Sequence, residues 1–228
     1  MTSSLRSIRN LAQPGSGEQG SSPGSVDAPT ERCEMCSVAL EERHGHVADL
    51  DGHRLLCCCR ACSLLFTREG AGRGRFKALP TASRHVAEFA MTQAQWDGLQ
   101  IPVDLVFLMR QSDDDRVRAF YPGPAGTTES LLDLAAWSDV VAANPVLDDV
   151  ADDVEAVLLR RHEDTVECFV VPVDVCYELA GLVRVSWDGF SGGEVLWRRI
   201  DEFFAALRVH STPSPSRRRG RPETTPAG

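Results

Sequence analysis

The sequence predicts an α+β fold: a small four-cysteine zinc ribbon, then an α+β domain with a mainly antiparallel sheet of about four strands and covering helices. Three observations predict it. Two Cys-x-x-Cys pairs lie near the N-terminus, separated by 22 residues. Farther along, two pairs of β-rich segments flank short polar turns. Three more segments carry apolar residues at helical spacing.

The composition is that of a globular protein and excludes several classes of function. Of the 228 residues, 43% are hydrophobic and 25% are charged. The net charge of −9 offers no basic face to phosphates, so we expect no nucleic-acid partner. No stretch approaches the roughly 20 apolar residues of a membrane span, and the N-terminus lacks the apolar core of a secretory signal. We therefore predict a cytoplasmic protein, in which clustered cysteines more often bind metal or do redox chemistry than form disulfides.

Changes in composition along the chain divide it into ordered and disordered parts. Both termini are rich in Ser, Gly and Pro and show no apolar period, which indicates disorder. A Gly-rich stretch, EGAGRGRF, marks a boundary in between. We expect a disordered tail (1–30), a four-cysteine metal-binding ribbon (31–68), a linker (69–79), an α+β domain (80–208) and a disordered basic tail (209–228).

Four cysteines give the ribbon its expected metal site: Cys33, Cys36, Cys59 and Cys62. A CxxC turn aims two sulfurs at one point, about 2.3 Å from a shared zinc ion, and two such turns complete a tetrahedron. The segment GHVADLDGHRLLC between the pairs predicts a hairpin that turns at Asp51-Gly52. This hairpin returns the second pair to the first.

Other potential ligands lie close to these four cysteines in the sequence. His44 and His46 are possible nitrogen ligands, although four thiolates already complete the shell. Cys57 has the same strand parity as Cys59, which makes it a reserve ligand. Cys58 faces the other way on the predicted strand and is expected to be a small apolar filler.

The metal's identity stays open between two ions. About 35 residues bury too little surface to offset chain entropy, so a structural zinc ion that staples the ribbon is the leading interpretation. Four thiolates also bind iron, which would make the protein a rubredoxin-like electron carrier. The turns lack the Pro and Gly typical of rubredoxin, because Ser37 follows Cys36 and Ser63 follows Cys62. A redox thiol pair and a disulfide knot are weaker alternatives.

Two hairpins are predicted in the α+β domain. Residues 101–110 and 117–122 are β-rich and flank the polar turn QSDDD. Residues 154–161 and 165–172 repeat this arrangement around HED. Together they account for the expected four strands of an antiparallel sheet.

Helices are predicted at 130–141, 173–184 and 193–208. The first has Thr127, Thr128 or Ser130 available as an N-terminal cap. In the last, apolar residues from Leu196 to Leu207 form one stripe that should face the core.

The sequence does not predict an enzyme. The loop at 120–134 opens a predicted helix and could hold an anion, but ordinary capping explains it better. The acidic run 148–155 matches no calcium loop. Cys168 and Cys176 are expected to be buried thiols. No nucleophile, base and oxyanion donor come together that we can name.

Several motifs together resemble a known family: Trp96 with Ile101-Pro102-Val103, Ala119 to Pro122, Pro124 to Ser130, Asp153 to Ala156, and Pro172 to Leu179. The chain resembles an actinobacterial family of uncharacterised proteins encoded beside nickel–iron hydrogenase genes. The similarity covers about 33–208 and includes the cysteine module. It implies a setting, hydrogenase assembly or electron supply, but no reaction and no catalytic residues.

We therefore predict a non-enzymatic zinc-binding accessory protein that binds a protein partner during hydrogenase assembly or maturation. The expected partners are hydrogenase subunits or maturation factors. The alternative is an iron-containing, rubredoxin-like electron-transfer protein for the same system.

Overall fold

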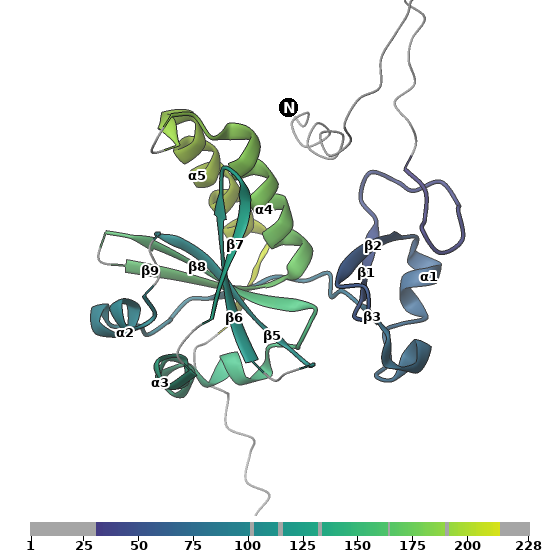
Figure 1. Cartoon of the computed structure of the whole chain (residues 1–228), viewed down its shortest axis with the longest axis horizontal. Coiled ribbons are helices and arrows are strands. Elements are labelled where there is room, and N and C mark those ends of the chain that lie inside the picture. The colour runs from purple at the N-terminus through teal and green to yellow at the C-terminus, as the bar shows by residue number, and fades with distance from the viewer. Residues whose placement is uncertain are drawn as a thin grey trace, which may run out of the picture.

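The computed structural model describes residues 31–100, 103–113, 116–131, 134–163, 165–189 and 192–214. The predicted disordered tails therefore lie outside the described residues, apart from residues 209–214. Within the described part, the chain forms a three-stranded sheet and a seven-stranded sheet. Figure 1 shows the small sheet with its helix beside the larger body.

The small sheet contains the predicted hairpin. Strand β1 (Gly45–Asp49) pairs antiparallel with β2 (Arg54–Cys58), and the turn between them includes Asp51 and Gly52, as predicted. Strand β3 (Phe76–Ala78) adds to the other edge of β1. The helix α1 (Arg60–Leu64) follows β2 directly, and the short 3-10 helix η2 (Ala71–Gly74) precedes β3.

The large sheet has seven strands in the order β10-β4-β9-β8-β5-β6-β7, more than the four expected. The predicted hairpins are both present. They are β5 (Leu105–Gln111) with β6 (Arg116–Gly123), and β8 (Glu155–His162) with β9 (Thr165–Pro172). The sheet is mainly antiparallel, because only β10 with β4 pairs parallel among its described strands.

The three additional strands lack a strong sequence pattern. β4 (Arg84–Val86) and β10 (Thr212–Ser214) have three residues each, too few to display an alternation. β7 (Gly126–Leu131) is polar, and it lies where the sequence predicted a loop and helix cap. Thr127 and Thr128 pair with β6 instead of capping a helix, because β-branched residues fit an edge strand beside a long partner. The capping prediction was wrong.

Helices cover both faces of the large sheet (Figure 1). The helices α4 (Val173–Ser186) and α5 (Gly193–His210) pack on one face, as the apolar stripes predict. The short α2 (Gln93–Gly98) and α3 (Leu134–Ala143) pack on the other, with the 3-10 helix η3 (Pro145–Asp149) after α3. Successive strand residues serve opposite faces: Leu158 joins the α4–α5 core, whereas Leu159 joins the α2–α3 core.

The small sheet is attached to the large domain by shared core packing. Ala48 of β1 and Leu79 are buried in the same apolar cluster as α4 and α5. The Lys77 ammonium also donates a hydrogen bond of 2.6 Å to the Asp152 carbonyl oxygen. Val47, next to Ala48, points instead into the module's own small core. The two sides of β1 thus serve two different cores.

Candidate metal centre

The first cysteine pair lies in a tight turn just before the small sheet. The Cys33 amide donates to the Val38 carbonyl at 2.8 Å, and the Ser37 amide donates to the Cys33 carbonyl at 2.8 Å. Ser37 has a φ of 64°, in the left-handed region where the chain reverses direction. The reversal places the side chains of Cys33 and Cys36 on the same side of the turn.

The second pair lies at the start of a helix, whereas the first pair lies in a tight turn. Cys59 is the N-cap of α1, and Cys62 lies within its first turn. The Ser63 amide donates to the Cys59 carbonyl at 3.0 Å. Gly45 lets this helix approach β1, since a Cβ atom there would lie 3.3 Å from the Ser63 side chain.

The structure brings together the four cysteines that the sequence singled out: Cys33, Cys36, Cys59 and Cys62. Their sulfurs all lie within 4.8 Å of one another, and those of Cys36 and Cys59 are 3.8 Å apart. Zinc–sulfur bonds of about 2.3 Å give a tetrahedron with an edge of about 3.8 Å. All eight cysteines are free thiols, so these sulfurs are available to an ion. The donor set and spacing fit a four-thiolate metal site.

Backbone donors stabilise one thiolate in this group. Burial opposes charge on Cys33, but hydrogen bonds from the amides of Cys59, Cys36 and Met35 lower the pKa of its thiol to about 6. The pKa of Cys62 is raised, first by its hydrogen bond to Cys36 and then by burial. The surroundings of Cys33 thus favour its thiolate form, and a bound cation would displace protons from cysteine ligands.

The structure groups Cys57, the reserve ligand of the sequence analysis, with two histidines rather than with the four cysteines. Strand β2 ends at Cys58 and Cys59 is the N-cap of α1, so the strand parity that linked Cys59 to Cys57 no longer applies. The sulfur of Cys57 lies instead with ring nitrogens of His44 and His46, all within 4.8 Å of one another. This second cluster was missed, because both histidines were considered only as substitutes in the first site.

Cys58 has the role expected of a small apolar filler. It is fully buried, and it packs with Cys33, Val47 and Leu56 in the core of the module. Burial, followed by the charge on Cys33, raises the pKa of the Cys58 thiol to about 12. It therefore stays protonated beside the metal site.

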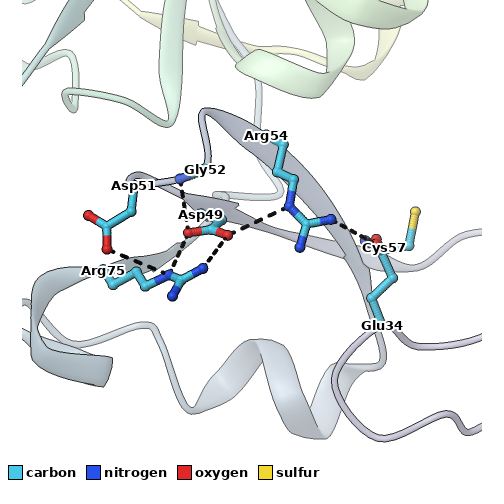
Figure 2. Close-up of polar contacts among 7 residues, drawn as sticks. All are labelled: Glu34, Asp49, Asp51, Gly52, Arg54, Cys57 and Arg75. Carbon is cyan, nitrogen blue, oxygen red and sulfur yellow. Dashed lines mark hydrogen bonds and ion pairs between the residues drawn. The ribbon is translucent and has the colours of Figure 1, made fainter.

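A buried carboxylate fixes the hairpin that carries these cysteines (Figure 2). Asp49 accepts hydrogen bonds from the Arg75 guanidinium at 2.7 and 2.9 Å, and these bonds are the main reason why its pKa falls to about 2. The Arg54 guanidinium lies 3.6 Å from the same carboxylate and 3.7 Å from the carboxylate of Glu34. Glu34 in turn accepts the Cys57 amide at 2.6 Å. The network ties the first cysteine turn to β2.

The large domain contributes no further metal-type cluster among the residues that the structure describes. Cys168 and Cys176 are fully buried, as predicted for structural thiols. Burial raises the pKa of both. In the same described part, no helix is long and apolar enough to cross a membrane.

Comparison with known families gives one match. Residues 32–211 match the model of DUF5947, which is described as a family of unknown function. No curated protein and no solved structure matches the chain. The matched range includes both the cysteine module and the large domain.

Proposed function

We propose a function for this chain, which belongs to the DUF5947 family of unknown function. It is a non-enzymatic accessory protein in which Cys33, Cys36, Cys59 and Cys62 hold a structural zinc ion. One observation carries the proposal: two separate CxxC pairs bring four sulfurs within 4.8 Å of one another. The zinc ion staples the ribbon at 31–68, whose sheet is completed by β3 (Phe76–Ala78) from the expected linker at 69–79, and the α+β domain at 80–208 follows.

The size of the module's core supports a structural role for the ion. Its buried apolar cluster consists of only four residues: Cys33, Val47, Leu56 and Cys58. A core of this size stabilises a fold poorly, and small modules usually need a disulfide or a metal. Because the cysteines form no disulfide, a metal ion is the remaining way to stabilise the module. Bound zinc contributes an apparent free energy of about 10 to 16 kcal/mol to the folding of comparable peptides.

Exposed apolar side chains beside the site support a protein partner. Leu64 and Leu65 follow the second cysteine pair and are 57% and 67% exposed. Val38 follows the first pair and is 49% exposed. Exposed apolar side chains that follow both metal-binding pairs offer a partner contact points next to the site. From the resemblance to proteins encoded beside nickel–iron hydrogenase genes, we propose a hydrogenase subunit or maturation factor as this partner.

The alternative function is rubredoxin-like electron transfer by an iron ion in the same four-thiolate site. Its specific support is the exposure of Cys36, because an exposed ligand gives an electron a short route to a partner's surface. Zinc is inert to redox change, so the two functions require different ions.

Metal analysis separates these functions. The full-length protein is purified from its own host without added metal, and zinc and iron are quantified per chain. One tightly held zinc in a colourless preparation supports the structural role; one iron with visible thiolate-to-iron absorption supports electron transfer. Cys36→Ser should lose that ion, whereas Cys168→Ala, which removes a thiol outside the module, should keep it. A chain that binds neither ion at this site refutes both functions.

The partner is tested by affinity capture with the same preparation and with a variant that carries Leu64→Ser and Leu65→Ser. A hydrogenase subunit or maturation factor should be retained by the wild-type protein and lost from the variant. Equal recovery from both would remove the exposed leucines from the proposed interface.

A further inference from the structure

We propose a second metal site, in which His44, His46 and Cys57 bind one borderline divalent transition-metal ion. It shares no ligand with the four-cysteine site, so this proposal can be tested independently of the proposed function. One ring nitrogen from each histidine and the Cys57 sulfur already lie within 4.8 Å of one another.

The hairpin register brings these three residues together. His46 of β1 is directly paired with Cys57 of β2, so both side chains lie on the same face of the sheet. His44 precedes His46 by two residues, which places it on that face as well if the strand direction is continued. The two imidazole rings are close, with centroids 5.0 Å apart.

Hydrogen bonds orient both imidazoles for metal binding. His44 Nδ1 lies 3.0 Å from the Glu41 carbonyl oxygen, and His46 Nδ1 lies 2.7 Å from Asp174 Oδ2. A carbonyl oxygen and a carboxylate accept hydrogen bonds, so Nδ1 donates in each ring, and Nε2 is the nitrogen that would bind an ion. Metal-bound histidines typically have this second bond, which fixes the tautomer and raises the basicity of the ligand nitrogen.

The Glu31 carboxylate lies beside the cluster on its exposed side. The side chains of His44 and His46 are 5% and 11% exposed, whereas Glu31 beside them is 45% exposed. The Glu31 carboxylate lies 3.9 Å from His44 Nε2 and 3.8 Å from the Cys57 sulfur. Zinc also takes carboxylate oxygens as ligands, so Glu31 stands next to the fourth position of a three-ligand site.

The donor types define the class of ion. Two imidazoles and a thiolate suit Zn²⁺, Co²⁺ or Ni²⁺, whereas Mg²⁺ and Ca²⁺ prefer oxygen ligands. Asp174, His46 and Cys57 also have the order of a carboxylate, base and nucleophile. A nucleophilic relay, however, gives no role to His44, whose Nδ1 is fixed in the same way as that of His46. A metal site gives a role to each residue: His44, His46 and Cys57 bind the ion, and Asp174 orients His46.

Metal stoichiometry in the full-length protein tests the proposal. Apo protein is prepared under reducing conditions and titrated with Co²⁺, whose thiolate charge-transfer bands report sulfur ligation, and Zn²⁺ is then added in competition. The wild-type protein should bind two ions per chain. His46→Gln and Cys57→Ser should bind one, whereas His53→Asn, on the exposed turn of the same hairpin, should bind two. Cys36→Ser should lose the other ion, which distinguishes failure of the first site from failure of the second.

Thiol protection provides a measurement that does not depend on the variants. Zn²⁺ beyond the first equivalent should slow alkylation of Cys57 by iodoacetamide at least about tenfold, as mapped by mass spectrometry, because a metal-bound thiolate is a poor nucleophile. Binding that saturates at one ion per wild-type chain overturns the second site. So does Cys57 alkylation that excess Zn²⁺ leaves unchanged, the outcome expected of a nucleophilic relay.

Discussion

Asp174 Oδ2 lies 2.7 Å from His46 Nδ1, and this contact joins the start of helix α4 to strand β1 of the cysteine module. The two residues are 128 positions apart in the chain. Asp174 is 30% exposed at its side chain, and His46 is 11% exposed, so the bond lies at the junction of the two parts. A residue of the large domain therefore sets the orientation of a proposed ligand in the small one.

Replacing this carboxylate should weaken the second metal site alone. In Asp174→Asn, the His46 ring loses a charged acceptor, and the affinity for the second Co²⁺ should fall about 10- to 100-fold, as is typical of such partners. Competition titration with a chelator of known affinity measures the change. The first ion should bind as in the wild-type protein, and Asp188→Asn, in an exposed loop, serves as the control. An unchanged second affinity would show that Asp174 does not position His46 for metal binding.

A second prediction concerns the turn of the β1–β2 hairpin. A Cβ atom on Gly52 would lie 2.7 Å from Asp49 Oδ2, too close for a stable contact, so Gly52→Ala must displace the carboxylate that Arg75 holds. Because overpacking costs about 1 to 3 kcal/mol, we expect the module to lose stability on this order. The control is Gly98→Ala, where the added Cβ meets only Ala136 at 3.8 Å. Hydrogen exchange of residues 45–58 measures the effect, and equal protection in both variants would contradict it.

The sequence predicts some residues of this site but not others. Regular CxxC spacing identified Cys33, Cys36, Cys59 and Cys62, because the motif itself constrains where the sulfurs point. The second cluster also had a signal. A hairpin that turns at Asp51-Gly52 places His46 opposite Cys57, since each lies five positions from the turn (51 − 46 = 5 and 57 − 52 = 5). What the sequence could not supply was Asp174, because its approach depends on how the module docks.

The same distinction applies to the fold. Both long hairpins were predicted because strong apolar runs flank polar turns. The strands β4 and β10 were missed because their pairing is decided by tertiary contacts rather than by a local pattern: Thr212 lies beside Arg84, more than a hundred positions away. The polar strand β7 was read as a loop because its threonines suit a helix cap as well as an edge strand.

A third prediction tests the packing of the α2–α3 face. Asn144 is fully buried, and its side chain bonds both backbone groups of Ala90, the amide at 2.8 Å and the carbonyl at 2.7 Å. Asn144→Ala removes both bonds, and because Ala90 is exposed to water we expect a cost of about 0.5 to 1.5 kcal/mol for each hydrogen bond lost. Urea denaturation should show a lower midpoint with an unchanged slope. Gln93→Ala, at an exposed helix position, should leave the midpoint in place.

Metal removal should loosen the module much more than the large domain. The module's own core has only four buried residues, whereas strands β8 and β9 lie between two helix-covered faces. Chelation under reducing conditions removes the ion that holds the cysteine turn against α1, so amide protection over residues 33–66 should fall at least about tenfold while β8 and β9 keep theirs. Hydrogen exchange with mass spectrometry resolves the two regions in one experiment, and restoring one equivalent of Zn²⁺ should restore protection. The contact between Asp174 and His46 opposes this loosening, as does the packing of Ala48 and Leu79. If protection of residues 33–66 survives chelation, these contacts rather than the ion hold the module together, and the zinc ion loses its structural role.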